Sequence, residues 1–193
     1  MAMSVITGGQ SPLQGCLNSY LTDKPSVVKA KKQEKMQRYV TSNAVLQHLR
    51  QTKPAGCLFD LDGSNAQPMP GARELVELCH KKNIPMAIAT SSGMQAVLVK
   101  LKPHPWLESI KVRVHGDDAN IDRGKPAPDL FIEAAKQLNV DPKNCWAFED
   151  SPAGATAAFA AGCEVFVLPA PGLNAKDYPE KSIILETLFN VPI

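Results

Sequence analysis

Short apolar runs alternate with amphipathic segments from residue 56 to the end of the sequence. The amphipathic segments repeat their apolar positions with the period of an α-helix, whereas the runs are continuously apolar, as strands buried on both faces are. We predict strands at residues 57–62, 84–90, 110–115, 144–148 and 164–168. We predict helices at residues 72–82, 129–138 and 153–161, a further helix ending near residue 100, and a last short element at residues 183–188.

The alternation of strands with helices indicates the fold class. Strands that are separated by helices pair in parallel. Right-handed crossovers then place helices on both faces of the sheet. The sequence therefore predicts an α/β protein with a three-layer, Rossmann-like parallel sheet.

Residues 1–53 have a different pattern and a different charge. A stretch rich in Gly, Ser and Gln at residues 8–18 is typical of a loop or of disorder, and residues 26–51 are helix-prone with a thin apolar stripe. Residues 1–53 hold 8 basic and 2 acidic residues, whereas residues 54–193 hold 13 basic and 17 acidic ones. We predict a basic N-terminal extension over residues 1–53, partly helical or disordered, and an α/β core over residues 54–193.

The amino-acid composition argues against nucleic-acid and membrane partners. Hydrophobic residues make up 44% and charged residues 21%, which is ordinary for a soluble globular protein. The basic extension could bind nucleic acid, but Tyr20 and Tyr39 are its only aromatic residues, too few for a base-stacking platform. We favour a solvated basic helix face and expect no nucleic-acid partner. We also expect no membrane partner, because no apolar run approaches the ~20 residues that cross a bilayer.

The number and spacing of the cysteines indicate the cellular compartment of the protein. The five cysteines are scattered and form no C-x-x-C pair. The first 22 residues have neither a basic start nor an apolar block, so no secretory signal is visible. We predict reduced, buried thiols in a cytoplasmic protein.

Polar and charged side chains follow the predicted strands at their carboxyl ends, where ligands bind in an open parallel sheet. Taken singly, an aspartate can start a turn and a hydroxyl can cap a helix. Taken together, at successive strand ends, these side chains predict one site. They are Asp60 and Asp62 at the end of the first strand, Thr90 and Ser91 at the end of the second, Lys125 in the loop after the third, and Glu149 and Asp150 at the end of the fourth.

The acidic members of this set indicate a bound cation. Asp60, Asp62 and Asp150 would repel one another unless a cation lay between them. Mg²⁺ suits hard carboxylate oxygens and keeps water and substrate phosphate among its ligands. Lys125 and the Thr90 hydroxyl would bind a phosphate. One carboxylate can act as a covalent nucleophile, and a second, two residues on, can act as general acid and base.

Four sequence stretches resemble the motifs of the haloacid dehalogenase-like (HAD) superfamily of phosphohydrolases, in the order of that family. They are FDLDG at residues 59–63, ATSS at 89–92, GKPAPD at 124–129 and FEDSPAG at 148–154. The last two are similar to the branch that holds sugar-phosphate and nucleotide phosphatases and phosphomutases. The resemblance implies a Mg²⁺-dependent phosphatase that hydrolyses a phosphomonoester, of the sugar-phosphate or nucleotide class, through an aspartyl-phosphate intermediate.

The resemblance also implies a role for each matching residue. Asp60 would be the nucleophile and Asp62 the general acid/base. Thr90, Ser91 and Lys125 would hold the phosphoryl group. The ligands of Mg²⁺ would be Asp60, the backbone carbonyl of Asp62, and Asp150, with Glu149 assisting. Residues 54–193 would then be a HAD-like catalytic core.

The sequence departs from the family pattern in one large way. Relatives in this branch carry a helical cap domain between the first and second motifs, whereas here only residues 64–71 separate the first motif from the next predicted helix. A cap excludes water and selects the substrate, so we do not expect a phosphomutase. The protein could be a capless phosphatase that acts on a large or exposed phosphate. The basic extension or a second subunit, in a homo-oligomer, could instead cover the site.

A non-catalytic role is the main alternative. A chain without its cap could be a catalytically weak or inactive HAD-like protein that serves in binding or interaction. His115, Asp117 and Asp118 follow the third predicted strand and could also face the site. We interpret these three as turn or cap residues.

Overall fold

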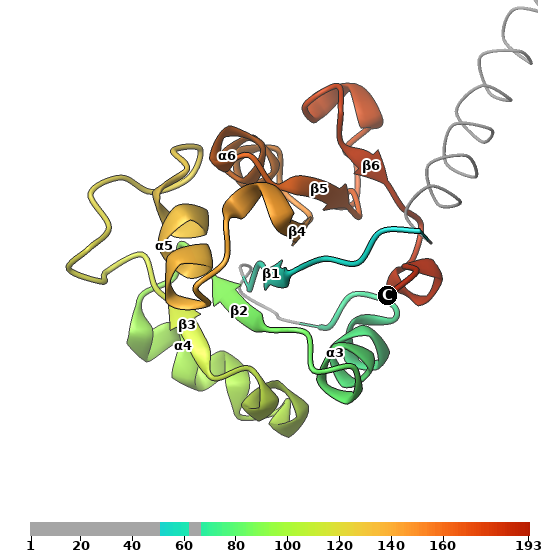
Figure 1. Cartoon of the computed structure of the whole chain (residues 1–193). Coiled ribbons are helices and arrows are strands. Elements are labelled where there is room, and N and C mark those ends of the chain that lie inside the picture. The colour runs from blue at the N-terminus through green and yellow to red at the C-terminus, as the bar shows by residue number, and fades with distance from the viewer. Residues whose placement is uncertain (1–50, 62–66) are drawn as a thin grey trace, which may run out of the picture. The chain divides into compact units, whose positions relative to one another are not determined.

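The computed structural model describes residues 51–61 and 67–193, and Figure 1 draws them in colour. The basic extension predicted over residues 1–53 lies outside the described residues, except for residues 51–53. Asp62 also lies outside them.

The predicted elements are present with ends shifted by a few residues, and the element predicted at residues 183–188 divides into β6 and the start of η4. The strands are β1 (Gly56–Phe59), β2 (Met86–Ala89), β3 (Val112–Val114), β4 (Cys145–Glu149), β5 (Glu164–Val167) and β6 (Ile183–Ile184). The α-helices are α3 (Ala72–Lys81), α4 (Met94–Leu101), α5 (Asp129–Gln137) and α6 (Pro152–Ala161). Short 3₁₀ helices are η1 (Pro105–Ser109), η2 (Pro142–Asn144), η3 (Ala175–Asp177) and η4 (Leu188–Asn190).

The six strands form one parallel sheet in the order β3-β2-β1-β4-β5-β6. Phe59, the last residue of β1, pairs with Ile88 on one side and with Phe148 on the other. The carboxyl ends of β1, β2 and β4 therefore lie level with one another. Whatever follows these three strands meets at one edge of the sheet.

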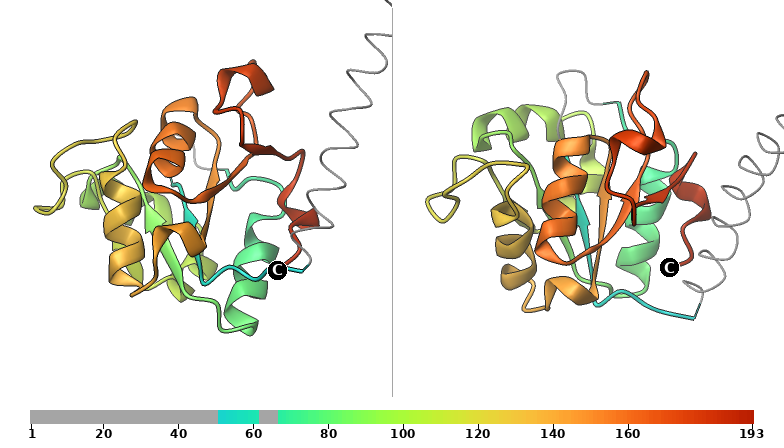
Figure 2. Two further views of the ribbon diagram at one scale, coloured as in Figure 1. Left: turned by 45° about the horizontal axis from the view of Figure 1, so that its top comes forward. Right: turned by 90° about the horizontal axis from the view of Figure 1, so that it is seen from above.

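Two cores lie on the two faces of this sheet. On one face, β-strand side chains pack against α3, η1 and η4, and the rings of Phe59, Phe148 and Phe166 stack with centroids 5.1 Å apart. On the other face, α5 and α6 pack on small residues such as Ala87 and Ala147. Figures 1 and 2 show the sheet between α3 and α4 on one side and α5 and α6 on the other. The prediction of a three-layer α/β fold is confirmed.

The ends of α6 follow from local sequence. The Ser151 hydroxyl accepts a hydrogen bond from the backbone N–H of Gly154 at 3.0 Å, and Pro152 occupies the first helical turn, where its missing N–H costs nothing. Gly162 ends the helix with a φ of 97°, a left-handed conformation that glycine adopts without a steric penalty. This helix start fixes the backbone that follows Glu149 and Asp150.

Two further predictions from the sequence concern the cysteines and the absence of membrane-spanning helices. The four described cysteines are buried free thiols, while Cys16 lies outside the described residues. None of the helices in residues 51–61 and 67–193 has the length and apolar character needed to span a bilayer.

Candidate active site

The buried amine of Lys125, in the loop after β3, joins the loop after β1 to the last residue of β4. The Nζ atom of Lys125 donates to a carboxylate oxygen of Asp60 and, at 2.7 Å, to Oε1 of Glu149. The side chains of Lys125, Asp60 and Glu149 are 4%, 7% and 0% exposed. Water therefore screens these charges little, and the contacts hold the three groups in one geometry.

The electrostatics at Glu149 show two opposing effects. Burial raises the pKa of the Glu149 carboxyl above its usual range, because the charged form loses its water. The Lys125 amine acts in the opposite direction, by charge and by hydrogen bonding, and the nearby Asp150 carboxylate adds to the upward shift. The net upward direction means that burial is the stronger effect here.

Three carboxylates of the site lie close enough to share an ion. Oxygens of Asp60, Glu149 and Asp150 lie within 4.8 Å of one another. Both oxygens of Glu149 are engaged, one by Lys125 and the other by the Ser151 hydroxyl at 3.2 Å. The structure thus brings together Asp60, Lys125, Glu149 and Asp150, as the sequence predicted. It does not describe Asp62.

Thr90 links the loops that follow β1 and β2. Its side chain is fully buried, and its hydroxyl donates to the backbone carbonyl of Leu61 at 3.2 Å while it accepts from the N–H of Ser92 at 3.1 Å. Ser91 is exposed in the same loop. Thr90 and Ser91 therefore lie at the carboxyl edge of the sheet, as the sequence predicted.

Sequence reasoning missed Lys100, on α4. Its amine donates to the Ser92 hydroxyl at 2.7 Å and to the carbonyl of Leu61 at 3.2 Å. Lys100 and Thr90 thus bind the same carbonyl and hold the β1 and β2 loops together. A lysine within an amphipathic helix reads as a surface residue, so no local signal could have found it.

Tyr178, near the C-terminal end of the chain, also supports the site and was missed. Its hydroxyl donates to the backbone carbonyl of Asp150 at 2.6 Å. Burial raises the pKa of Tyr178, and the charges of nearby acidic residues act in the same direction. The hydroxyl therefore stays protonated and can donate to this carbonyl, which helps to fix the turn after β4.

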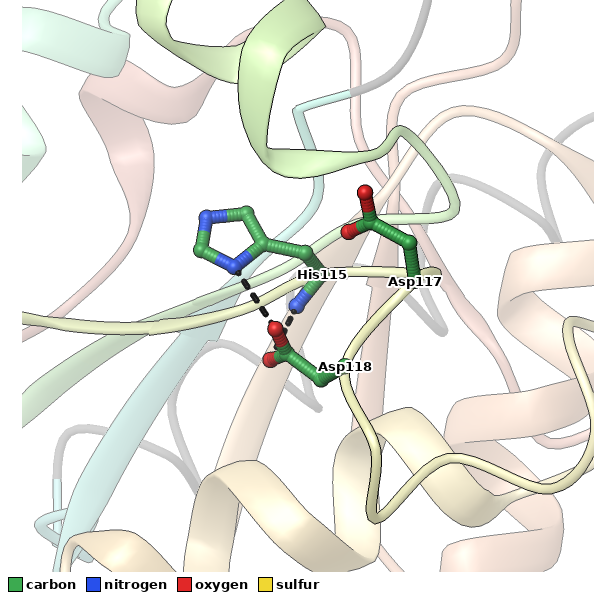
Figure 3. Close-up of side chains that lie close together, drawn as sticks. All are labelled: His115, Asp117 and Asp118. Carbon is green, nitrogen blue, oxygen red and sulfur yellow. Dashed lines mark hydrogen bonds and ion pairs between the residues drawn. The ribbon is translucent and has the colours of Figure 1, made fainter.

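The second acidic group follows β3 and is drawn in Figure 3. Asp118 accepts from the backbone N–H of His115 at 2.8 Å and lies 3.2 Å from Nδ1 of the same histidine. Asp117 accepts from the N–H of Met94 at 2.9 Å, at the first residue of α4. These contacts agree with the interpretation of Asp117 and Asp118 as cap and turn residues, although Asp117 lies 23 positions from the helix start that it contacts. The side chains of His115, Asp117 and Asp118 also lie within 4.8 Å of one another, as a metal site requires.

Relatives in sequence are named phosphatases. The chain is 41% identical over 128 residues to "Probable pseudouridine-5'-phosphatase" of Drosophila melanogaster, covering 64% of this chain and 55% of that protein. It is 41% identical over 126 residues to (DL)-glycerol-3-phosphatase 2 of Arabidopsis thaliana, covering 63% and 52%. The chain therefore spans about half the length of these curated relatives.

A solved structure shows the same fold, and a family model matches most of the chain. CbbY from Rhodobacter sphaeroides in complex with phosphate superimposes with a TM-score of 0.55 at 26% identity, covering 65% of this chain and 59% of that one. Residues 20–162 match the model of the haloacid dehalogenase-like hydrolases. With the motifs of this family at the carboxyl edge of the sheet, the chain belongs to the haloacid dehalogenase-like hydrolase family.

Proposed function

We propose that the chain hydrolyses phosphomonoesters with Mg²⁺ and uses Asp60 as its nucleophile. The observation that carries this proposal is the contact of the buried Lys125 amine with both Asp60 and Glu149, beside Asp150. A carboxylate that is held by a protonated amine at the end of a parallel strand can attack phosphorus and form a covalent phosphoryl intermediate. The family membership and the phosphatase names of the relatives support the same reaction.

The donor set fits a hard divalent cation. Three carboxylates within 4.8 Å of one another supply the oxygen ligands that Mg²⁺ prefers. Since both oxygens of Glu149 already accept hydrogen bonds, the proposed direct ligands are Asp60, Asp150 and the backbone carbonyl of Asp62. Glu149 assists by holding Lys125. When bound, the ion would neutralise the charge of the phosphoryl oxygens.

The proposed reaction has two steps. First, an oxygen of Asp60 forms a bond to phosphorus while the bond from phosphorus to the leaving oxygen breaks. Asp62 donates a proton to that oxygen, which leaves as an alcohol. Second, Asp62 takes a proton from a water that attacks the phosphorus, and the bond to Asp60 breaks to release inorganic phosphate. Asp62 lies outside the described residues, so its role is supported by its place in the FDLDG sequence.

The remaining residues bind and orient the substrate. Lys125 holds the Asp60 carboxylate and balances the charge of the transferred group. The Thr90 hydroxyl and Ser91 lie at the end of the neighbouring strand and are proposed to bind phosphoryl oxygens. Only residues 60–71 link β1 to α3. The proposed enzyme is therefore either a capless phosphatase that acts on a large or exposed phosphate, or one whose site is covered by residues 1–53 or by a second copy of the chain.

The proposed substrate class is a sugar phosphate or a nucleotide. Its support is indirect and comes from the names of two relatives, a probable pseudouridine-5'-phosphatase and a (DL)-glycerol-3-phosphatase. The short link between β1 and α3 favours plain hydrolysis over a phosphomutase reaction, because a mutase must keep water from its intermediate. The same short link favours the second candidate function, a HAD-like binding protein with little turnover.

Phosphate release decides between these functions. We expect Mg²⁺-dependent hydrolysis of glycerol 3-phosphate or a nucleoside monophosphate, which stops with a chelator and returns when Mg²⁺ is added. Asp60→Asn should lower the rate by a factor of about 10³ or more. Asp122→Asn, at an exposed aspartate in the loop after β3, is the matched control. Equal rates for Asp60→Asn and the parent protein would refute the nucleophile, and no turnover by any variant would favour the binding protein.

A further inference from the structure

A cavity of about 140 Å³ lies beside the carboxylates of the candidate site. Asp60, Glu149 and Asp150 form one part of its wall. The rest is largely apolar and comes from the segment before α3, from α3, η1 and η4, with Met69, Ala72, Val76, Trp106, Leu107 and Leu188 among its members.

The size and the apolar wall of the cavity point to one kind of occupant. The cavity is partly open to solvent, so a ligand can enter it from outside and bury apolar surface against its wall. An apolar cavity of about 150 Å³ is known to hold a benzene molecule. A sugar of similar size would leave its hydroxyls without partners along such a wall, at a cost in free energy. A single flat aromatic ring therefore fits better than a polyol.

Four aromatic side chains, Phe59, His104, Trp106 and Phe148, line the cavity. The indole of Trp106 lies beside the His104 imidazole, with centroids 5.9 Å apart and planes at 57°. Phe59 and Phe148 also line the cavity and stack on each other at 5.1 Å. Aromatic rings attract one another in offset and edge-to-face geometries, so an aromatic ligand would gain contacts with this wall that a polyol would not.

We propose that this cavity binds an aromatic ring of the phosphomonoester substrate while the site at Asp60 and Lys125 holds its phosphate. The inference rests on the proposed function and deepens it by naming a class of leaving group. One molecule can reach both places, because the carboxylates of the site are themselves part of the cavity wall. The cavity would then supply substrate specificity beside the short link between β1 and α3.

The first test compares two substrates that both leave as primary alcohols, benzyl phosphate and glycerol 3-phosphate. We expect kcat/KM to favour benzyl phosphate, and Ala72→Phe, which fills the cavity from the first turn of α3, to lower that preference about tenfold. Ala160→Phe, at an exposed position of α6 outside the cavity, should keep the parent preference. Trp106→Ala, which enlarges the cavity, should instead raise the rate of naphthylmethyl phosphate relative to benzyl phosphate.

A binding measurement separates the cavity from the chemistry. Benzylphosphonate has a P–C bond that hydrolysis cannot break, and its ring protons should show contact with the protein by ligand-detected NMR. The signal should be lost in Ala72→Phe and kept in Ala160→Phe, with thermal unfolding used to confirm that both variants fold. Ring binding without hydrolysis of any ester would overturn the phosphatase proposal, and with it the assignment of the ring to a leaving group, while showing that the cavity binds aromatic rings. Unchanged ring contact and an unchanged substrate preference in Ala72→Phe would overturn the cavity proposal.

Discussion

The carboxylate of Glu149 fills the space that a side chain at Gly154 would need. A Cβ atom on Gly154 would lie 2.0 Å from Oε1 of Glu149. The lack of a side chain therefore lets a buried carboxylate lie against the first turn of α6, where the helix dipole favours negative charge. From that position Glu149 holds Lys125, and Lys125 holds Asp60.

Gly154→Ala should move Glu149 and with it the Lys125 amine. We expect the free energy of unfolding to fall by about 1–3 kcal/mol, because the added methyl group overpacks a closed space. Phosphate release should fall more than about tenfold, because small displacements of catalytic groups are costly. Urea unfolding and steady-state hydrolysis measure the two effects.

Gly124→Ala is the matched control for that change. A Cβ at Gly124 would meet nothing within 4 Å, so the same substitution should cost little stability there. If Gly154→Ala and Gly124→Ala behaved alike, the close approach of Glu149 to α6 would not matter for the site.

The Lys125 amine should matter for stability as well as for activity. Lys125→Met leaves two carboxylates near one another without their cation, and breaking a buried pair of this kind costs about 3–5 kcal/mol. We expect a loss of that order in urea unfolding without Mg²⁺, together with loss of hydrolysis.

A double variant separates the two effects. Adding Glu149→Gln to Lys125→Met removes one of the unpaired charges, so it should recover part of the stability and none of the activity. A double variant as unstable as Lys125→Met alone would show that the contact with Glu149 is not the source of the loss.

The sequence predicted those residues of the candidate site whose position follows from the order and pairing of the strands. Asp60 and Asp150 each follow an apolar strand, and parallel pairing of β1 with β4 is enough to bring them to one edge. The contacts of Lys100 and Gly154 could not be predicted in this way. They depend on where α4 and α6 pack against the loops, and neither residue differs locally from an ordinary surface lysine or helix glycine.

Lys100 is expected to act as a positioning residue. Lys100→Met removes the hydrogen bonds to Ser92 and to the carbonyl of Leu61, which weakens the link between the β1 and β2 loops, although the bond from Thr90 to the same carbonyl remains. We expect kcat/KM to fall about tenfold, whereas Lys100→Arg, which keeps the charge and the donors, should recover part of it. Lys102→Met, at an exposed lysine just after α4, is the control. Equal losses in Lys100→Met and Lys102→Met would exclude a specific role for Lys100.

The buried thiols make stability depend on pH in the alkaline range. Burial raises the pKa of Cys145 to about 11 and that of Cys163 to about 12, from the ordinary value of 9.0 that we take for the unfolded chain. Above pH 9 the unfolded chain therefore releases thiol protons that the folded protein still holds, so the folded state loses stability as the pH rises. Each thiol should contribute a slope of about −1.4 kcal/mol per pH unit until the pH reaches its folded pKa. Urea unfolding between pH 7 and 10.5, for the parent and for Cys163→Ala, measures this slope. The variant should be less stable at pH 7 and show the shallower decline above pH 9, and parallel curves for the two proteins would contradict the expectation.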